Sequence, residues 1–214
     1  KSIKPVCMLY KNASQINFNN TEVAFKDKSN GDLQEMRLLF KIMNSPKWVA
    51  FGKIMTTIAF HIHFPIEWLL QRTIYKHFCG GLSINDSSRL IDKLSESNVG
   101  TILDYAAEGE NSEKVFDATC NEIMQTITFS HNNKKTPFSA FKVSGIGSSD
   151  LMAKVSNNEI LNQAETKSYE LLKKRMDNIC KMGYELDVPI LIDAEETWIQ
   201  PLLDKLILGM MRKY

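Results

Sequence analysis

Between residues 32 and 43 an apolar residue returns every third or fourth position, which is the spacing of one helical face. These positions are Leu33, Met36, Leu39, Phe40 and Met43. Ser45–Pro46 is typical of a helix start, so we expect a second helix over 46–60. A third helix over 66–78 is expected to end at Gly80–Gly81. After an irregular arm over 1–30, about the first eighty residues are therefore predicted to be helical.

In the second half of the chain, helix-type and strand-type segments alternate. The strand-type runs are short and apolar, and they are Thr101–Tyr105, Phe138–Val143 and Val188–Ile192. Helices are expected around them, with predicted starts at Asn85 or Asp86, at Ser112, at a Ser156–Glu159 capping box and at Trp198. Parallel strands need a connection of a dozen or more residues, and these helices provide it. The pattern therefore predicts an α/β fold with a parallel sheet.

A parallel sheet of this kind is either covered on both faces or closed into a barrel. A complete eightfold barrel takes roughly 250 residues, whereas only residues 85–214 belong to the alternating region. We therefore predict an N-terminal helical arm over 1–84, followed over 85–214 by the first three βα units of a (β/α)8 TIM-like barrel. Because the sequence stops where a fourth strand is due, we expect the chain to be truncated.

Composition and charge narrow the classes of function. Apolar residues make up 43% of the chain and charged residues 24%, the balance of a globular protein with a packed core. The net charge of +1 gives no overall field that favours nucleic acid or an anionic membrane. The longest apolar stretch, 54–66, is too short to span a membrane, and no apolar signal core opens the sequence. Zinc-type spacing is absent, which favours a reduced, cytoplasmic setting for the cysteines, Cys7, Cys79, Cys120 and Cys180.

Charged residues follow each predicted strand, at the edge where barrels of this kind carry their active sites. Asp104 follows the first strand, Lys142 ends the second, and Asp193 and Glu195 follow the third. One cation among several carboxylates fits a small zwitterionic substrate, with Lys142 on its carboxylate and an acid near its amine. A structural alternative is that Glu195–Glu196 stabilise the dipole of the next helix. Lys142 favours the functional interpretation, because a lysine in a buried strand is costly to desolvate without a partner.

Other patterns have plainer explanations. Gly145–Ser149 could bind a phosphate through backbone N–H groups, but with two glycines a plain loop is more frequent. The His61–His63 pair has the spacing of a metal site, yet it falls in the helical region, and we expect no metal there. An alternative function is a metal-dependent lyase or hydrolase, with Asp104, Asp193 and Glu195 as Mg²⁺ ligands. Another is a non-catalytic half-barrel that folds against a partner chain.

Three segments resemble the proline dehydrogenase family, in particular its single-activity, flavin-dependent members. They are Ile102–Glu108, Phe138–Gly147 and Leu191–Pro201, spaced like the family's first three barrel strands. Phe18–Phe25 and Phe78–Gly81 are also similar to that family. The resemblance covers nearly the whole chain, and its third segment is the most specific.

The resemblance implies a distorted (β/α)8 barrel that holds FAD and oxidises L-proline to 1-pyrroline-5-carboxylate, the first step of proline catabolism. Electrons would then pass to a quinone. Lys142 matches the family lysine that pairs with the substrate carboxylate, and Asp193 matches an active-site aspartate. Ala194 matches a flavin-contacting position, and Glu108 matches a glutamate whose ion pair with an arginine closes the site.

The resemblance also has implications for the chain as a whole. The family's remaining strands have no counterpart here, so the 214 residues by themselves are expected to be inactive. We expect no nucleic-acid partner. The expected location is the cytoplasm or the periphery of an inner membrane, which is mitochondrial if the source is eukaryotic. The apolar helices between Trp48 and Phe78 could dock on a lipid surface, although packing against the barrel is the commoner use of such faces.

Overall fold

The computed structural model describes residues 19–105 and 112–214. Its contacts divide the chain into two compact units, Lys1–Cys79 and Gly80–Tyr214. Each unit is described by itself. The assignment of a helical arm and a half-barrel as functional domains, with a boundary after residue 84, stays a prediction.

The first unit is helical, as expected. Its elements are α1 (Thr21–Ala24), α2 (Asn30–Met43), α3 (Pro46–His61), α4 (Glu67–Leu70), a π-helical turn (Gln71–Tyr75) and α5 (Lys76–Phe78). Lys76 joins α5 to α2, because its Nζ lies 2.8 Å from Glu35 Oε2 and 3.1 Å from Asp32 Oδ1. The ring of Phe40 meets that of Phe78 edge to face, with their centroids 6.1 Å apart. These contacts fold the helices back on one another.

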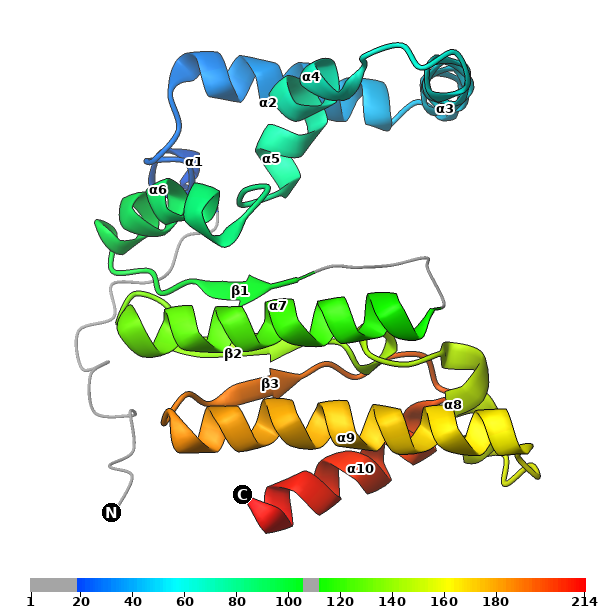
Figure 1. The fold of residues 1–214 in the computed structure, drawn as a ribbon. Helices are drawn as coiled ribbons and strands as arrows, with labels where there is room; N and C mark the ends of the chain where they lie inside the picture. Colours follow the sequence, from blue (N-terminus) through cyan, green and yellow to red (C-terminus); the bar gives the residue numbers. More distant parts are fainter. Residues whose placement is uncertain (1–18, 106–111) are drawn as a thin grey trace. The chain divides into compact units, whose positions relative to one another are not determined.

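The second unit alternates helix and strand and contains a three-stranded sheet in the order β1-β2-β3. Its elements are α6 (Ile84–Ser95), β1 (Ile102–Asp104), α7 (Glu113–Asn132), β2 (Phe138–Phe141), α8 (Ser149–Ser156), α9 (Gln163–Glu185), β3 (Ile190–Ile192) and α10 (Gln200–Lys213). Both strand pairs are parallel, as the crossover helices require. Figure 1 shows α7 and α9 lying alongside the strands on one side of the sheet.

Two predicted helix starts are wrong. The side chain of Ser83, not Asn85 or Asp86, accepts the cap hydrogen bond of α6. The long helix α9 begins after Asn162, whose capping box is formed with Glu165. The expected Ser156–Glu159 box does not form, because Ser148 caps the preceding helix α8, which ends at Ser156.

The core of the second unit lies between the sheet and its helices. Ser139 and Phe141 of β2 point toward this side and are fully buried, and Ser139 Oγ lies 2.9 Å from Thr126 Oγ1 of α7. Alternation along a strand and the parallel register put Ile190 and Ile192 on the same side. The apolar side chains of this core are contributed by α7, the β2–α8 loop, α8, α9 and α10, and its largest buried members include Ile123, Ile127, Ile146, Met152, Leu172, Met176, Ile179 and Leu203.

The opposite face of the sheet is open. Ile102 and Leu191 are each 43% exposed and Phe138 is 36% exposed. By alternation these residues lie on the face that does not meet the helices. In a closed (β/α)8 barrel this face points to the interior. The three units therefore have the sidedness that the predicted fold class requires.

A buried arginine joins three elements on the helical side. Arg175 of α9 donates from Nε to Asp117 Oδ1 at 2.7 Å, from Nη2 to Glu113 Oε2 at 2.5 Å and from Nη1 to the Ile146 carbonyl oxygen at 3.2 Å. Burial opposes the charged form of Arg175, but the hydrogen bonds to Glu113 and Asp117 outweigh burial and raise its pKa. The guanidinium therefore stays charged and holds the start of α7 and the loop after β2 against α9.

Replacing Arg175 with Met should lower the free energy of unfolding by about 2–3 kcal/mol, because the Ile146 carbonyl loses its donor and two carboxylates lose their partner. Urea denaturation measures this loss. Lys174→Met is the matched control, since Lys174 is the exposed neighbour on the same helix. Equal stability of the two variants would contradict a stabilising role for the Arg175 contacts.

Two helical glycines should respond in opposite directions to alanine. A Cβ on Gly183 would lie 2.5 Å from Ile190 Cδ1 and 3.0 Å from the Val188 carbonyl oxygen, so Gly183→Ala should cost about 1–3 kcal/mol. A Cβ on Gly209 meets nothing within 4 Å, so Gly209→Ala should gain up to about 1 kcal/mol from helix propensity. Thermal melts of both variants test the pair. A stabilised Gly183→Ala variant would show that α9 and β3 are packed less closely than described.

Candidate functional site

Three charged residues stand at the carboxyl ends of the three strands. Asp104 is the last residue of β1, Lys142 follows β2, and Asp193 follows β3. The register pairs Asp104 with Ala140, two positions before Lys142, and Phe141 with Ile192, one position before Asp193. Because side chains alternate along a strand, all three charged residues fall on the open face of the sheet. The register puts Asp104 two residues short of the level of Lys142 and Asp193, and the roles expected of these residues stay predictions.

Lys142 and Asp193 are direct neighbours across the β2–β3 pair. The parallel ladder continues past the strands, because the backbone N–H of Asp193 donates to the Phe141 carbonyl oxygen at 3.1 Å. Lys142 is therefore level with Asp193 on the adjacent strand, where neighbouring backbones are about 4.8 Å apart. Both residues are half-buried. Lys142 and Asp193 thus lie side by side, each half-buried, just after the carboxyl ends of β2 and β3.

The residues next to this pair differ in accessibility. Ala194 is exposed immediately after Asp193. A 3₁₀ turn over Val143–Gly145 begins directly after Lys142. Glu108, the predicted gating residue, lies outside the described residues.

Glu195 is placed differently from the structural alternative derived from the sequence. The helix α10 begins at Gln200 and has no acidic residue in its first turn, so stabilisation of its dipole by Glu195–Glu196 in that turn is ruled out. The half-buried Glu195 instead reaches the loop after β2, where its Oε1 accepts the Ser144 N–H at 2.9 Å. A carboxylate of the chain thus accepts the N–H of the residue directly before the Gly145–Ser149 segment.

The alternative metal sites lack a converging ligand set. Among residues 19–105 and 112–214, no three His, Cys, Asp or Glu side chains are grouped as a metal ion requires. This includes Asp104, Asp193 and Glu195, the proposed Mg²⁺ ligands. His61 ends α3, and His63 follows it in an exposed turn with φ of 53°.

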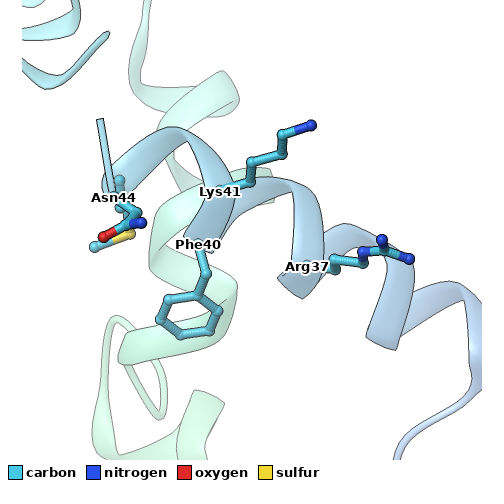
Figure 2. A pocket seen from close by; sticks show the side chains of 5 residues that line it. Arg37, Phe40, Lys41 and Asn44 are labelled. Carbon is cyan, nitrogen blue, oxygen red and sulfur yellow. The ribbon is translucent and has the colours of Figure 1, made fainter. Parts of the chain in front are cut away.

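Three surface hollows are outlined by described residues, and none of the three is lined by Lys142 or Asp193. One lies beside β1 and includes Leu103, Tyr105 and Phe129, and another lies beside β3 and includes Ile192 and Met210. The third lies at the end of α2 (Figure 2). There the charged ends of Arg37 and Lys41 point apart, and the ring of Phe40 turns toward a neighbouring helix. That hollow offers no converging polar groups, whereas the first two flank the edges of the sheet.

Arg175 was not identified from the sequence, although a signal for it exists. Leu172, Arg175, Met176 and Ile179 follow the spacing of one helical face, and all four are buried. An arginine on an apolar helical face needs buried acceptors. Its influence on the site is indirect, through the Ile146 carbonyl in the loop that follows Lys142.

Comparison with known proteins gives a consistent result. The family model described as proline dehydrogenase matches residues 87–214. Carbapenem antibiotics biosynthesis protein CarD of Pectobacterium carotovorum subsp. carotovorum is 31% identical over 137 residues, which cover 64% of this chain and 36% of that protein. Proline dehydrogenase 1, mitochondrial, of Dictyostelium discoideum is 25% identical over 240 residues, which cover 91% of this chain and 41% of that protein.

A solved structure has a similar fold. The crystal structure of proline utilization A (PutA) from Bdellovibrio bacteriovorus, inactivated by N-propargylglycine, aligns with a TM-score of 0.53 and 16% identity, covering 89% of this chain and 21% of that one. This likeness agrees with the predicted partial barrel. The chain spans 36% and 41% of the length of the two relatives named above. Because the family model covers more than half of its residues, this chain belongs to the proline dehydrogenase family.

Proposed function

We propose that this chain forms part of an enzyme that oxidises L-proline to 1-pyrroline-5-carboxylate with FAD as cofactor. The observation that carries the proposal is the Lys142–Asp193 pair, which the β2–β3 register sets side by side on the open face of the sheet. Membership of the proline dehydrogenase family supplies the reaction class. Proline is a small zwitterion, so it offers one group of each sign to such a pair.

The two charges have complementary roles toward proline. The Lys142 ammonium pairs with the proline carboxylate, and Asp193 lies toward the ring nitrogen, where a carboxylate favours the cationic amine and orients the ring. Both residues are half-buried, so their interactions with a bound zwitterion are less screened than on an open surface. Lys142 is thus the substrate-binding residue and Asp193 the catalytic one.

The strand exits also fit a flavin. Ala194 is exposed beside Asp193 and has no side chain beyond Cβ, so a planar ring can approach the backbone there. When bound, FAD supplies the acceptor for the hydride that leaves the proline carbon next to nitrogen. The chain's own contribution is to hold proline in one orientation beside the end of β3, which Ala194 follows closely. Glu108 is proposed to pair with an arginine and exclude water when the substrate is bound.

A half-barrel that needs further strands is the second candidate, and the sheet edges favour it. Within the described part of the chain, β1 and β3 each pair with a neighbour on one side only. The hollows beside β1 and β3 lie where additional strands and helices would pack. In the first candidate, the strands that complete the barrel also complete a flavin site. In the second candidate, they complete only the fold.

A quinone is the proposed acceptor for the electrons of the reduced flavin, with peripheral contact to a membrane. No described helix is both long enough and apolar enough to cross a bilayer. Trp48, Phe51, Ile54 and Met55 of α3 are exposed and give the first unit an apolar surface of the kind that lies on lipid.

The visible absorption spectrum tests the proposed reaction. The protein expressed from its complete gene should show a flavin spectrum, and L-proline added without oxygen should bleach it. A soluble short-chain quinone should then restore the spectrum. A colourless protein, or a flavin that proline leaves oxidised, would remove the proposed function and leave the half-barrel with a structural partner.

Substitutions at the site separate the two residue roles. Lys142→Ala should raise the KM for L-proline roughly 10- to 100-fold, because a charge-assisted contact to the substrate carboxylate is lost. Asp193→Asn should lower kcat roughly 100-fold. Lys134→Ala and Asp187→Asn are matched controls on exposed residues at the other end of the sheet. Steady-state kinetics in which the site variants match their controls would contradict these roles.

A further inference from the structure

The loops that leave β2 and β3 are tied together by one side chain. The Ser144 N–H donates to Glu195 Oε1 at 2.9 Å across 51 positions of sequence. Ser144 stands two residues after Lys142, and Glu195 stands two residues after Asp193. The carboxylate of Glu195 therefore links the two strand exits that carry the proposed site.

Hydrogen bonds connect the loop that Glu195 holds to the backbone of Lys142. The Gly145 N–H donates to the Lys142 carbonyl oxygen at 3.1 Å, and the Ile146 N–H donates to the Val143 carbonyl oxygen at 3.0 Å. Val143 and Ile146 are fully buried in the core. Because the turn is closed by these bonds, a shift of its backbone is passed to the backbone of Lys142.

The other end of the link is also fixed. The Glu195 N–H donates to Gln200 Oε1 at 3.3 Å, and Gln200 Nε2 donates to Asp204 Oδ1 at 2.7 Å, which sets the orientation of the amide. Asp193, two residues earlier, is held by its ladder bond to Phe141. The backbone that carries Glu195 is thus anchored both to the sheet and to the first turns of α10.

We propose that Glu195 is a positioning residue that sets the location of Lys142 relative to Asp193. Its role is geometric, because the Ser144 N–H needs an acceptor at one point and does not need a net charge. From the helical side, Arg175 Nη1 donates to the Ile146 carbonyl oxygen at 3.2 Å. The loop after β2 is therefore held by hydrogen bonds at Ser144 and at Ile146. This inference rests on the proposed proline-oxidising function, and a misplaced lysine would then bind the substrate carboxylate poorly.

Three substitutions separate position from charge. Glu195→Gln keeps an acceptor oxygen at the same reach without the charge, and Glu195→Asp keeps the charge but is one methylene shorter. Glu195→Ala removes both. The control is Glu196→Ala, because Glu196 is an exposed carboxylate in the same segment. All four are made in the protein expressed from its complete gene.

Two readouts are expected to agree. The KM for L-proline should rise roughly 10-fold or more in Glu195→Ala and Glu195→Asp with a smaller change in kcat, while Glu195→Gln and Glu196→Ala stay within about threefold of the parent. Hydrogen exchange of the peptide that covers 142–148, measured by mass spectrometry, should accelerate in Glu195→Ala and Glu195→Asp only. This second readout does not require catalysis.

The outcomes that overturn the proposal are distinct from failure of the proposed function. If Glu195→Asp behaves like the parent while Glu195→Gln is impaired, Glu195 acts through its charge and the positioning role is wrong. If exchange over 142–148 is unchanged in Glu195→Ala, the link does not hold the loop. If the parent protein shows no proline-dependent bleaching, the proposed function fails, and the exchange data alone decide whether the link exists. If Glu195→Ala does not fold, the comparison of Glu195→Asp with Glu195→Gln carries the test.

Discussion

The parallel register between β2 and β3 is the constraint on which the candidate site depends. It sets Phe141 opposite Ile192, and the ladder bond from the Asp193 N–H to the Phe141 carbonyl extends the pairing by one residue. A slip of one residue would turn Lys142 or Asp193 toward the helices, where a charge without a partner is costly. Burial of Phe141 and Ser139 on the helical side therefore selects the register that brings the two charges together on the other side.

The two faces of the sheet use charge differently. On the helical side, Arg175 is buried and donates to two carboxylates and a backbone carbonyl. These hydrogen bonds join α7, α9 and the loop after β2. On the open side, Lys142 and Asp193 are only half-buried and lie at the strand ends. The buried charge thus serves the packing of the helical side, whereas the half-buried charges stand at the edge of the sheet where we propose that the substrate binds.

The architecture could be predicted from the sequence because it depends on local patterns. Apolar periodicity located the helices, and three short apolar runs located the strands. The predicted strand over Phe138–Val143 is longer than β2, because the apolar run continues into a turn that packs in the core. The start of α9 was misplaced because Ser156–Glu159 and Asn162–Glu165 offer equally good capping sequences, and the chain uses the second. Only the preceding helix decides between them.

Contacts between distant segments could not be predicted in this way. Glu195 is one of several acidic residues after β3, and its partner is a backbone N–H in another loop, which leaves no mark in the composition. The charged residues at the strand exits were found because barrel topology alone brings strand ends together. The sequence therefore predicts which edge of the sheet carries the candidate site. It does not predict the tertiary hydrogen bonds that set the geometry of that site.

The composition of the open face argues that it is more than an unfinished core. Its positions within the strands are mostly apolar, namely Ile102, Phe138, Ala140 and Leu191, whereas each strand ends in or is followed directly by a charged residue, Asp104, Lys142 or Asp193. A face meant only for burial against further strands would gain nothing from a charged residue at each strand exit, because each charge would have to be desolvated or paired. This order, apolar within the strands and charged at their carboxyl ends, is the one expected of a barrel that carries its site at that end. Glu195 belongs to the same part of the sheet, because it follows Asp193 by two residues and accepts the Ser144 N–H of the loop after β2.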